Sequence, residues 1–219
     1  MFEIIDLTRR LTGRTLQFPG DQPGLVAGCV DLGRPDVQLT HLTHLDLHLG
    51  THIDAPLHFV PGGADIASLE SVLRPGIVVR TRDRVILPSV LPAVTLRGCA
   101  VLFDTGWAVS AESSAYFEGF PHLSPDTAAE LVARGAALVG IDSPSADKVD
   151  PTLECPTHRI LLGAGVPIVE GLANLDRLPE GAGAFWFGIF PLYLEGADGA
   201  PARAVAFLPG GPDATDQLD

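Results

Sequence analysis

The chain has 219 residues, of which 46% are hydrophobic and 19% charged, so one large domain with a sizeable core is expected and wholesale disorder is excluded. The formal net charge is −13, from 27 acidic and 14 basic residues, and no cluster of Lys or Arg offsets it. Because such a charge repels nucleic acids and anionic membrane surfaces, we expect neither as a partner.

The predicted elements are mainly short strands separated by turns. Strand patterns occur at residues 3–7, in an alternating segment before residue 59, and at 76–80, 100–105, 137–142, 166–172 and 202–209. The motifs PGDQPG (19–24) and PGGAD (61–65) predict turns. Residues 210–219 have no apolar periodicity, so we expect a flexible acidic tail after a single domain at 1–209.

Two helices are predicted. In the first, Ser124 supplies an N-cap oxygen, Pro125 suits the first helical position, and Gly135 ends the helix. The second begins at Pro156 and ends at Gly163. Because strands outnumber helices, the sequence predicts a single α/β domain with a mixed β-sheet core and flanking helices.

Cysteine usage and the termini indicate the compartment. Cys29, Cys99 and Cys155 are an odd number without CxxC spacing, which fits a reducing cytoplasm and small core residues better than a disulfide framework. The N-terminus lacks the apolar block of a signal peptide, and the most apolar window, 184–194, is too short to span a bilayer. We therefore expect a cytoplasmic protein.

The segment HLDLHLGTHIDAPLH, at 44–58, carries the strongest chemical signal. From 44 to 54, His, Asp and Gly50 occupy the even positions, and Leu, Thr and Ile the odd ones. In a strand, this alternation turns the imidazoles and carboxylates to one face and the apolar side chains to the core. Five of the seven histidines lie within eighteen residues, which favours a site over a chance polar face. Taken singly, His41 and His44 are better explained as exposed polar residues.

Strand geometry constrains how these histidines meet. A straight strand rises about 3.3 Å per residue, so His48 and His52 would lie roughly 13 Å apart at their Cα atoms. Two imidazoles with metal–nitrogen bonds of about 2.1 Å hardly reach one ion across that span. A shared metal therefore requires a bend, and Gly50 stands where a kink or bulge is needed.

The motif H-x-G-T-H-x-D-x-P-x-H resembles the signature of the metal-dependent cyclase family, which includes bacterial kynurenine formamidases and isatin hydrolases. It is matched without a gap at His48, Gly50, Thr51, His52, Asp54, Pro56 and His58. The resemblance continues in FPGDQP near the start, ALVGIDSPSAD, HRILLGAGVPIVEGLANLDRLP and PARAVAFLP, and so covers nearly the whole chain.

This resemblance implies a cyclase-like, swivelling β/β/α fold and a site with two divalent metal ions, Zn²⁺ or Mn²⁺. The metal ligands that it implies are His48, His52 and Asp54 for the first ion, and Asp54, His158 and Glu170 for the second. His58 would be the acid/base rather than a permanent ligand. The residue types agree with this, because imidazole and carboxylate suit zinc and manganese and no thiolate set competes. Cys155 lies close enough to His158 to keep a functional role open.

The implied reaction is hydrolysis of a small amide. Two divalent ions would generate hydroxide near neutral pH and polarise the carbonyl, while His58 protonates the leaving nitrogen. A serine hydrolase is disfavoured because Ser143 lacks both flanking glycines of a G-x-S-x-G elbow.

An aryl formamide such as N-formylkynurenine is the first substrate candidate. The formamidases usually carry tryptophan in the early loop, where Phe18 stands here and can still stack on an aryl ring. Asp104, in DTGW, replaces a residue that is often basic in relatives and would change how a substrate carboxylate is met. Trp107, Tyr116 and Phe117 either line the pocket or belong to the core.

Two alternatives remain open. One is another activity of the family, such as ring opening of a cyclic amide of the isatin type. The other is a metal-binding domain without a working acid/base, and His58 distinguishes it from the enzymes. Because relatives are commonly dimers or tetramers, the resemblance also implies a homo-oligomer.

Overall fold

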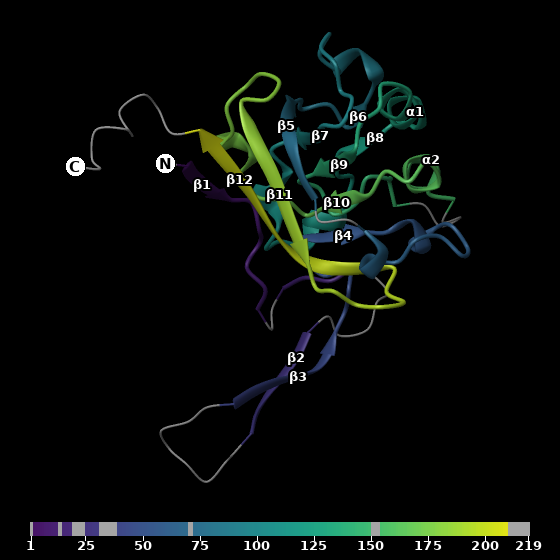
Figure 1. The fold of residues 1–219 in the computed structure, drawn as a ribbon. Helices are drawn as coiled ribbons and strands as arrows, with labels where there is room; N and C mark the ends of the chain where they lie inside the picture. Colours follow the sequence, from purple (N-terminus) through teal and green to yellow (C-terminus); the bar gives the residue numbers. More distant parts are fainter. Residues whose placement is uncertain are drawn as a thin grey trace, which may run out of the picture.

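The computed structural model describes residues 2–12, 15–18, 25–30, 39–69, 72–149 and 154–209. Its main feature is an eight-stranded mixed sheet in the order β1-β12-β11-β5-β7-β9-β10-β4. Because β12 also pairs with β4, the sheet curls until its last strand meets the second, which closes a circuit of strands. Figure 1 shows α1 and α2 together on one side of this sheet.

The bounds of the elements are as follows. The strands are β1 (Phe2–Asp6), β2 (Leu25–Val30), β3 (Leu39–Leu45), β4 (His52–Asp54), β5 (Val72–Arg80), β6 (Val85–Ile86), β7 (Ala100–Asp104), β8 (His122–Leu123), β9 (Leu138–Ile141), β10 (Ile168–Glu170), β11 (Phe185–Pro191) and β12 (Gly199–Pro209). The α-helices are α1 (Pro125–Ala133) and α2 (Pro156–Gly163), and the 3-10 turns include η1 (Pro56–His58).

The centre of the sheet is parallel and buried on both faces. Strands β5, β7, β9 and β10 pair in parallel, and every residue of β7 and β9 is buried, which explains their continuous apolar sequences. Val101 and Phe103 of β7 face a core layer that includes Leu131 of α1. Leu102 faces a second layer with Phe187, which draws on all eight strands and therefore lies inside the curled sheet.

Both predicted helices are confirmed. The Ser124 side chain accepts a hydrogen bond from the Thr127 amide at 3.1 Å, with Pro125 at the first position, and Gly135 follows α1 with a φ of +76°. The second helix begins at Pro156 and ends at Gly163, as the sequence predicts. The predicted single α/β domain with a mixed sheet is also correct.

The alternating segment 44–54 is not one strand, so that prediction is wrong in extent. β3 ends at Leu45 and β4 begins at His52, with a turn between them. Asp46 stops the strand because its carboxylate accepts from the His48 amide at 2.8 Å. Gly50 has a φ of +71°, so the bend predicted at this glycine is present.

Some elements have no counterpart in the predicted set, notably β2 and β11. The apolar window at 184–194 becomes β11, which lies between β5 and β12 in the sheet and is apolar for that reason. Among the described residues, no helix is long and apolar enough to cross a membrane. The predicted turn at 19–24, the Cys29 side chain and the tail at 210–219 lie outside the described residues.

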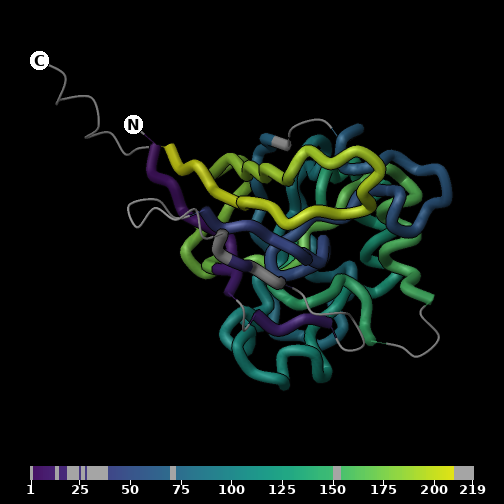
Figure 2. Tube along the Cα trace, turned by 90° about the horizontal axis from the view of Figure 1, so that it is seen from below, coloured from purple at the N-terminus to yellow at the C-terminus, as the bar shows by residue number. Residues whose placement is uncertain are grey.

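The two ends of the described chain meet in the sheet, whereas one hairpin leaves it. β1 pairs antiparallel with β12, and Figure 2 shows these two strands side by side. The β2–β3 hairpin extends away from the sheet, and Leu39 and Leu42 on it are about half exposed.

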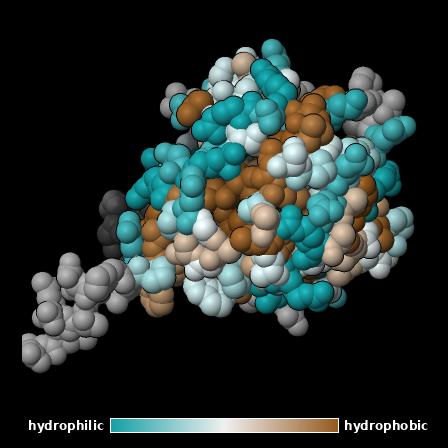
Figure 3. All heavy atoms as spheres, turned by 90° about the horizontal axis from the view of Figure 1, so that it is seen from above, coloured by the Kyte–Doolittle hydropathy of each residue, from teal (hydrophilic) through white to brown (hydrophobic). Residues whose placement is uncertain are grey.

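Figure 3 shows a face on which apolar side chains form a patch bordered by hydrophilic ones.

Candidate metal centre

Strand pairing brings distant ligand candidates together. In the antiparallel register of β10 with β4, Glu170 lies opposite His52, and β12 places Gly199 opposite Asp54. His158 enters from α2, where it is buried. The five predicted ligands therefore meet around β4, with His48 supplied by the turn before it. His58, the predicted acid/base, comes from η1 after β4.

Asp54 is the centre of this cluster. Its side chain is 1% exposed, and its Oδ1 lies 2.9 Å from His48 Nδ1 and 3.5 Å from His52 Nε2. Its Oδ2 lies 3.5 Å from His158 Nε2 but accepts no hydrogen bond. A buried carboxylate oxygen without a donor is costly, and a cation between Asp54 and the imidazoles would satisfy it.

The ligand atoms form two groups that share Asp54. In one, atoms of His52, Asp54 and Glu170 all lie within 4.8 Å of one another; in the other, atoms of His48, Asp54 and His58 do so. Glu170 also contacts the helix, because its Oε1 lies 3.2 Å from His158 Nε2. Asp54 belongs to both groups, as predicted, but the histidines divide differently: His58 rather than His52 is grouped with His48, and His52 rather than His158 with Glu170.

Two imidazoles are oriented by hydrogen bonds at their other nitrogen. His52 Nδ1 donates to the Gly50 carbonyl at 3.0 Å, and His158 Nδ1 lies 2.7 Å from Asp147 Oδ2. In each ring Nε2 is thereby directed at the buried carboxylates, which is the usual arrangement of metal-binding histidines. Asp147 was not among the predicted site residues, although it ends the SPSAD sequence that follows β9.

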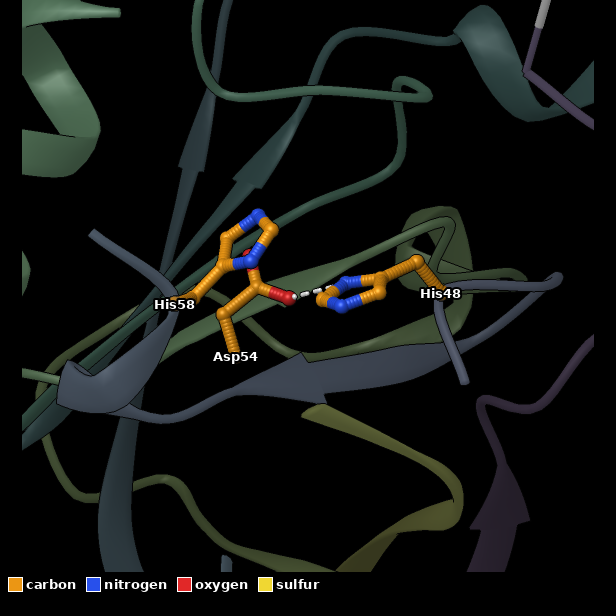
Figure 4. A group of neighbouring side chains, drawn as sticks. All are labelled: His48, Asp54 and His58. Atoms are coloured by element: carbon orange, nitrogen blue, oxygen red, sulfur yellow. Dashed lines mark hydrogen bonds and ion pairs between the residues drawn. The ribbon is translucent and has the colours of Figure 1, made fainter. Parts of the chain in front are cut away.

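The other two imidazoles share one carboxylate that the sequence interpretation missed. Asp198 Oδ2 lies 2.8 Å from His58 Nδ1 and 3.3 Å from His48 Nε2. The two rings stack with centroids 4.3 Å apart. Figure 4 shows His48 and His58 both directed toward the Asp54 carboxylate. No sequence signal marked Asp198, because it follows an irregular segment far from the histidine motif.

The electrostatics of the cluster favour a positive charge. Burial lowers the pKa of His48, but hydrogen bonds with Asp198 and Asp54 outweigh it and raise this pKa to about 10. Burial likewise lowers the pKa of His158, and its bonds to Asp147, Asp54 and Glu170 raise it well above the usual value. In both cases a proton is held where carboxylates surround an imidazole, and a metal ion supplies the same compensation.

The donor set fits zinc or manganese. It consists of imidazole nitrogens and carboxylate oxygens, without a thiolate. Cys155 does line the cavity, but burial raises the pKa of its thiol. Cys99 is buried, as predicted for a small core residue.

A cavity of about 420 Å³ opens onto the cluster. Phe18 lies on its wall, and its ring meets the Phe117 ring edge-on at 5.6 Å. Such a volume suits a small molecule, and its mixture of aromatic and titratable walls is typical of an active site. Phe18 is therefore placed where the sequence interpretation expects a residue that contacts substrate.

The other aromatic candidates for the pocket differ in position. Tyr116 is buried, donates through its hydroxyl to the Asp142 carbonyl, and lines with Phe117 a small cavity of about 20 Å³ beside Phe18, His48 and His52. The Trp107 indole donates to the Tyr116 carbonyl and does not line the larger cavity. Asp104 is buried beside Arg80, with Oδ2 3.3 Å from Nε, and does not line the cavity. Asp104 therefore does not lie where it would meet a substrate carboxylate in this cavity, and its effect on specificity stays a prediction.

His41 and His44 lie exposed on β3, as expected for polar residues outside the site.

Comparison with known proteins gives consistent matches over most of the chain. The model of the Cyclase family matches residues 5–148. A kynurenine formamidase from Salinibacter ruber is 35% identical over 211 residues, covering 92% of this chain and 96% of that protein. One from Bacillus cereus is 33% identical over 216 residues, covering 93% and 96%.

Solved structures share the fold. Isatin hydrolase A from Ralstonia solanacearum superposes with a TM-score of 0.82 over 95% of this chain and 92% of its own, at 22% identity. A structure described as a potential metal-dependent hydrolase with cyclase activity gives a TM-score of 0.78 at 27% identity and covers 96% of this chain and 100% of its own.

Proposed function

Because this chain belongs to the cyclase family, we propose that it is a metal-dependent amidohydrolase that cleaves the C–N bond of a small amide. An aryl formamide such as N-formylkynurenine is the first candidate substrate, which would place the enzyme in tryptophan catabolism. The observation that carries the proposal is the convergence on Asp54 of imidazoles from the turn, β4 and α2, next to Glu170 and a cavity. Relatives named kynurenine formamidase support this substrate class.

We propose two divalent ions, Zn²⁺ or Mn²⁺, as the cofactors. His48, His52 and Asp54 would hold one ion, and Asp54, His158 and Glu170 the other. When bound, the ions would act as Lewis acids toward the amide carbonyl and lower the pKa of an attacking water. The unsatisfied Asp54 Oδ2 and the orienting bonds to His52 and His158 support this assignment.

His58 is proposed as the general acid/base. Its ring lines the cavity, its Nδ1 is held by Asp198, and its Nε2 has no hydrogen-bond partner among the described residues. A proton at Nε2 would therefore be available to the leaving nitrogen. Ligand atoms of His58, His48 and Asp54 lie within 4.8 Å of one another, so the metal content of a His58 variant distinguishes an acid/base from a ligand.

Phe18 is proposed to contact the aryl ring of the substrate. An aromatic stack adds about 0.5–1.5 kcal/mol, so Phe18→Ala should raise KM for an aryl formamide about two- to tenfold with little change in kcat. Phe18→Trp is the matched control and should keep or lower KM. Steady-state kinetics on both variants decide this, and an unchanged KM in Phe18→Ala would remove Phe18 from the substrate site.

A homo-oligomer, dimer or tetramer, is also proposed, in the cytoplasm, with residues 1–209 as the domain. Exposed apolar side chains on the described surface support self-association: Leu39, Leu42, Trp186, Phe190 and Tyr193 are among them. Light scattering on the purified protein measures the mass directly. A monomer at micromolar concentration would contradict this part of the proposal.

The activity is tested on protein stripped with EDTA and reloaded with Zn²⁺ or Mn²⁺. We expect turnover of N-formylkynurenine or a simple aryl formamide, silenced by EDTA and restored by metal. Isatin is assayed in parallel, and preference for it would favour ring opening of a cyclic amide. Metal binding without turnover of any amide would support a metal-binding domain instead. His44→Ala, on exposed β3, is the control that should behave as wild type.

A further inference from the structure

Asp198 is a charged residue that contacts His58 and His48 of the cluster, and the proposed function assigns it no role of its own. Its Oδ2 accepts the Nδ1 hydrogen of His58 at 2.8 Å, the shorter of its two imidazole contacts. The side chain is 42% exposed, so it lies at the open edge of the cluster rather than in its buried part.

The backbone around Asp198 is fixed by hydrogen bonds on both sides. Its carbonyl accepts from the Ala55 amide at 2.9 Å, and the carbonyl of the preceding Ala197 accepts from Ile66 at 2.9 Å. After it, Gly199 pairs with Asp54 in the β12–β4 register. The Asp198 carboxylate is therefore held at a constant place relative to β4 and η1 by contacts that do not involve the imidazoles.

The contact determines which nitrogen of His58 carries a proton in the neutral ring. A carboxylate can only accept, so the hydrogen is on Nδ1 and the lone pair is on Nε2. The Nε2 atom has no hydrogen-bond partner among the described residues, and the ring lines the cavity. An imidazole without this contact would populate both tautomers and several ring orientations.

We propose that Asp198 is a positioning residue for the His58 acid/base, an inference that rests on the proposed function. With Nδ1 held, His58 Nε2 takes a proton from the attacking water as the C–O bond forms, and gives it to the amide nitrogen as the C–N bond breaks. The Nδ1 proton stays on the ring throughout, between His58 and Asp198. The products are the free arylamine and formic acid, which releases its proton to solvent to give formate, and no reactant besides water is needed.

Asp198 also contacts His48, a proposed metal ligand, at 3.3 Å. If Asp198 acts only through His48, its removal should cause loss of metal and should slow all substrates equally. If it acts through His58, its removal should slow mainly a substrate that needs proton transfer to the leaving group, so two substrates distinguish the roles. Both substrates need His58 as the base toward water, but only the aryl formamide also needs a proton on its leaving nitrogen, because 4-nitrophenyl formate releases a stable phenolate.

The experiment compares Asp198→Ala and Asp198→Asn in the full-length, metal-loaded enzyme. Asp198→Ala should lower kcat for the formamide about 10- to 100-fold at nearly constant KM and lower turnover of the ester by a clearly smaller factor. Metal stoichiometry should stay at the wild-type value. Asp198→Asn should recover a large part of kcat, because its side-chain carbonyl still accepts from Nδ1. Glu195→Gln, on an exposed residue of the same segment, is the matched control.

Nitrogen NMR of labelled histidine gives a readout besides activity. His58 should be in the Nδ1–H form in wild type and a mixture in Asp198→Ala. Equal loss of both substrates, loss of metal, or an unchanged tautomer in Asp198→Ala would each overturn the role of Asp198. A wild type that turns over neither substrate would instead overturn the proposed function, so the two failures are distinguishable.

Discussion

The two halves of the cluster around Asp54 differ in burial and in how their imidazoles are held. In the inner half, His52 and His158 are 5% exposed, and each ring has its own acceptor, the Gly50 carbonyl or Asp147. In the outer half, His48 and His58 are 25% and 28% exposed and share Asp198. The imidazoles of the inner half are thus shielded from water beside buried carboxylates, whereas those of the outer half are partly exposed at the cavity.

This difference indicates that the inner half mainly binds metal and that the outer half also takes part in the reaction. Rings that are buried and individually held lose little entropy when a metal binds, because they are already oriented. Rings at the open edge are accessible to a substrate and can exchange protons with it.

Asp54→Ala should have the largest effect because it removes the one carboxylate that both halves share. We expect loss of bound metal and activity at background level. Metal analysis after gel filtration, together with the formamide assay, measures both. Asp46→Asn, which removes the charge of a carboxylate in the preceding turn, tests whether loss of any nearby negative charge has the same effect on metal binding. Full metal content in Asp54→Ala would show that the two groups do not depend on Asp54.

His58→Ala affects only the outer half. Loss of a general acid/base should lower kcat for a formamide about 10²- to 10⁴-fold, while metal content stays at the wild-type value. His44→Ala is the matched control. A parallel fall in metal content would make His58 a ligand, as its distance from His48 and Asp54 also allows.

Asp147→Asn affects only the inner half. The His158 ring loses a charged acceptor at Nδ1, so metal affinity should fall about 10- to 100-fold, with kcat at saturating metal near the wild-type value. Competition with a chelating indicator measures the affinity. If kcat falls and metal affinity does not, the proposal that the inner half binds metal while the outer half reacts with substrate is wrong.

The stability of the metal-free protein should depend on pH through His48. Its pKa is raised to about 10, against about 6.5 in an unfolded chain, so its protonation stabilises the fold fully below about pH 6.5. This contribution is lost as the pH rises through about 10. His48→Gln should therefore reduce the free energy of unfolding by about 1–3 kcal/mol at pH 6, and by much less near pH 10.

Denaturant unfolding in EDTA at several pH values, with His44→Gln as control, measures this dependence. A difference between wild type and His48→Gln that grows with pH would contradict the assigned sign.

Much of the fold and of the ligand set could be predicted from local sequence. Both α-helices follow from a Ser124 cap and from prolines at their first positions, which act within one turn. Gly50 signalled the bend because only a residue without Cβ adopts a φ of +71° cheaply. The histidine motif is contiguous, so its members were visible before any folding was considered.

Other features depended on context that a local pattern does not contain. The alternation at 44–54 indicated a strand, but the Asp46 side chain bonds the chain into a turn. The apolar sequence of β11 suits a buried strand or a short buried helix equally, and its position beside β5 decides between them. Asp104 follows an apolar strand, and only packing shows that it faces Arg80 rather than the cavity.

Which side chains are suited to metal binding can be read from the amino-acid sequence, because residue type and short spacing are local properties. Which of those side chains lie together depends on the fold. Pairing of β10 and β12 with β4 sets Glu170 opposite His52 and brings Asp198 beside His58, across gaps that no periodicity spans. The physical reason is that strand register is fixed by the burial of the whole sheet, so the partners of a polar residue at its edge are a result of the global core.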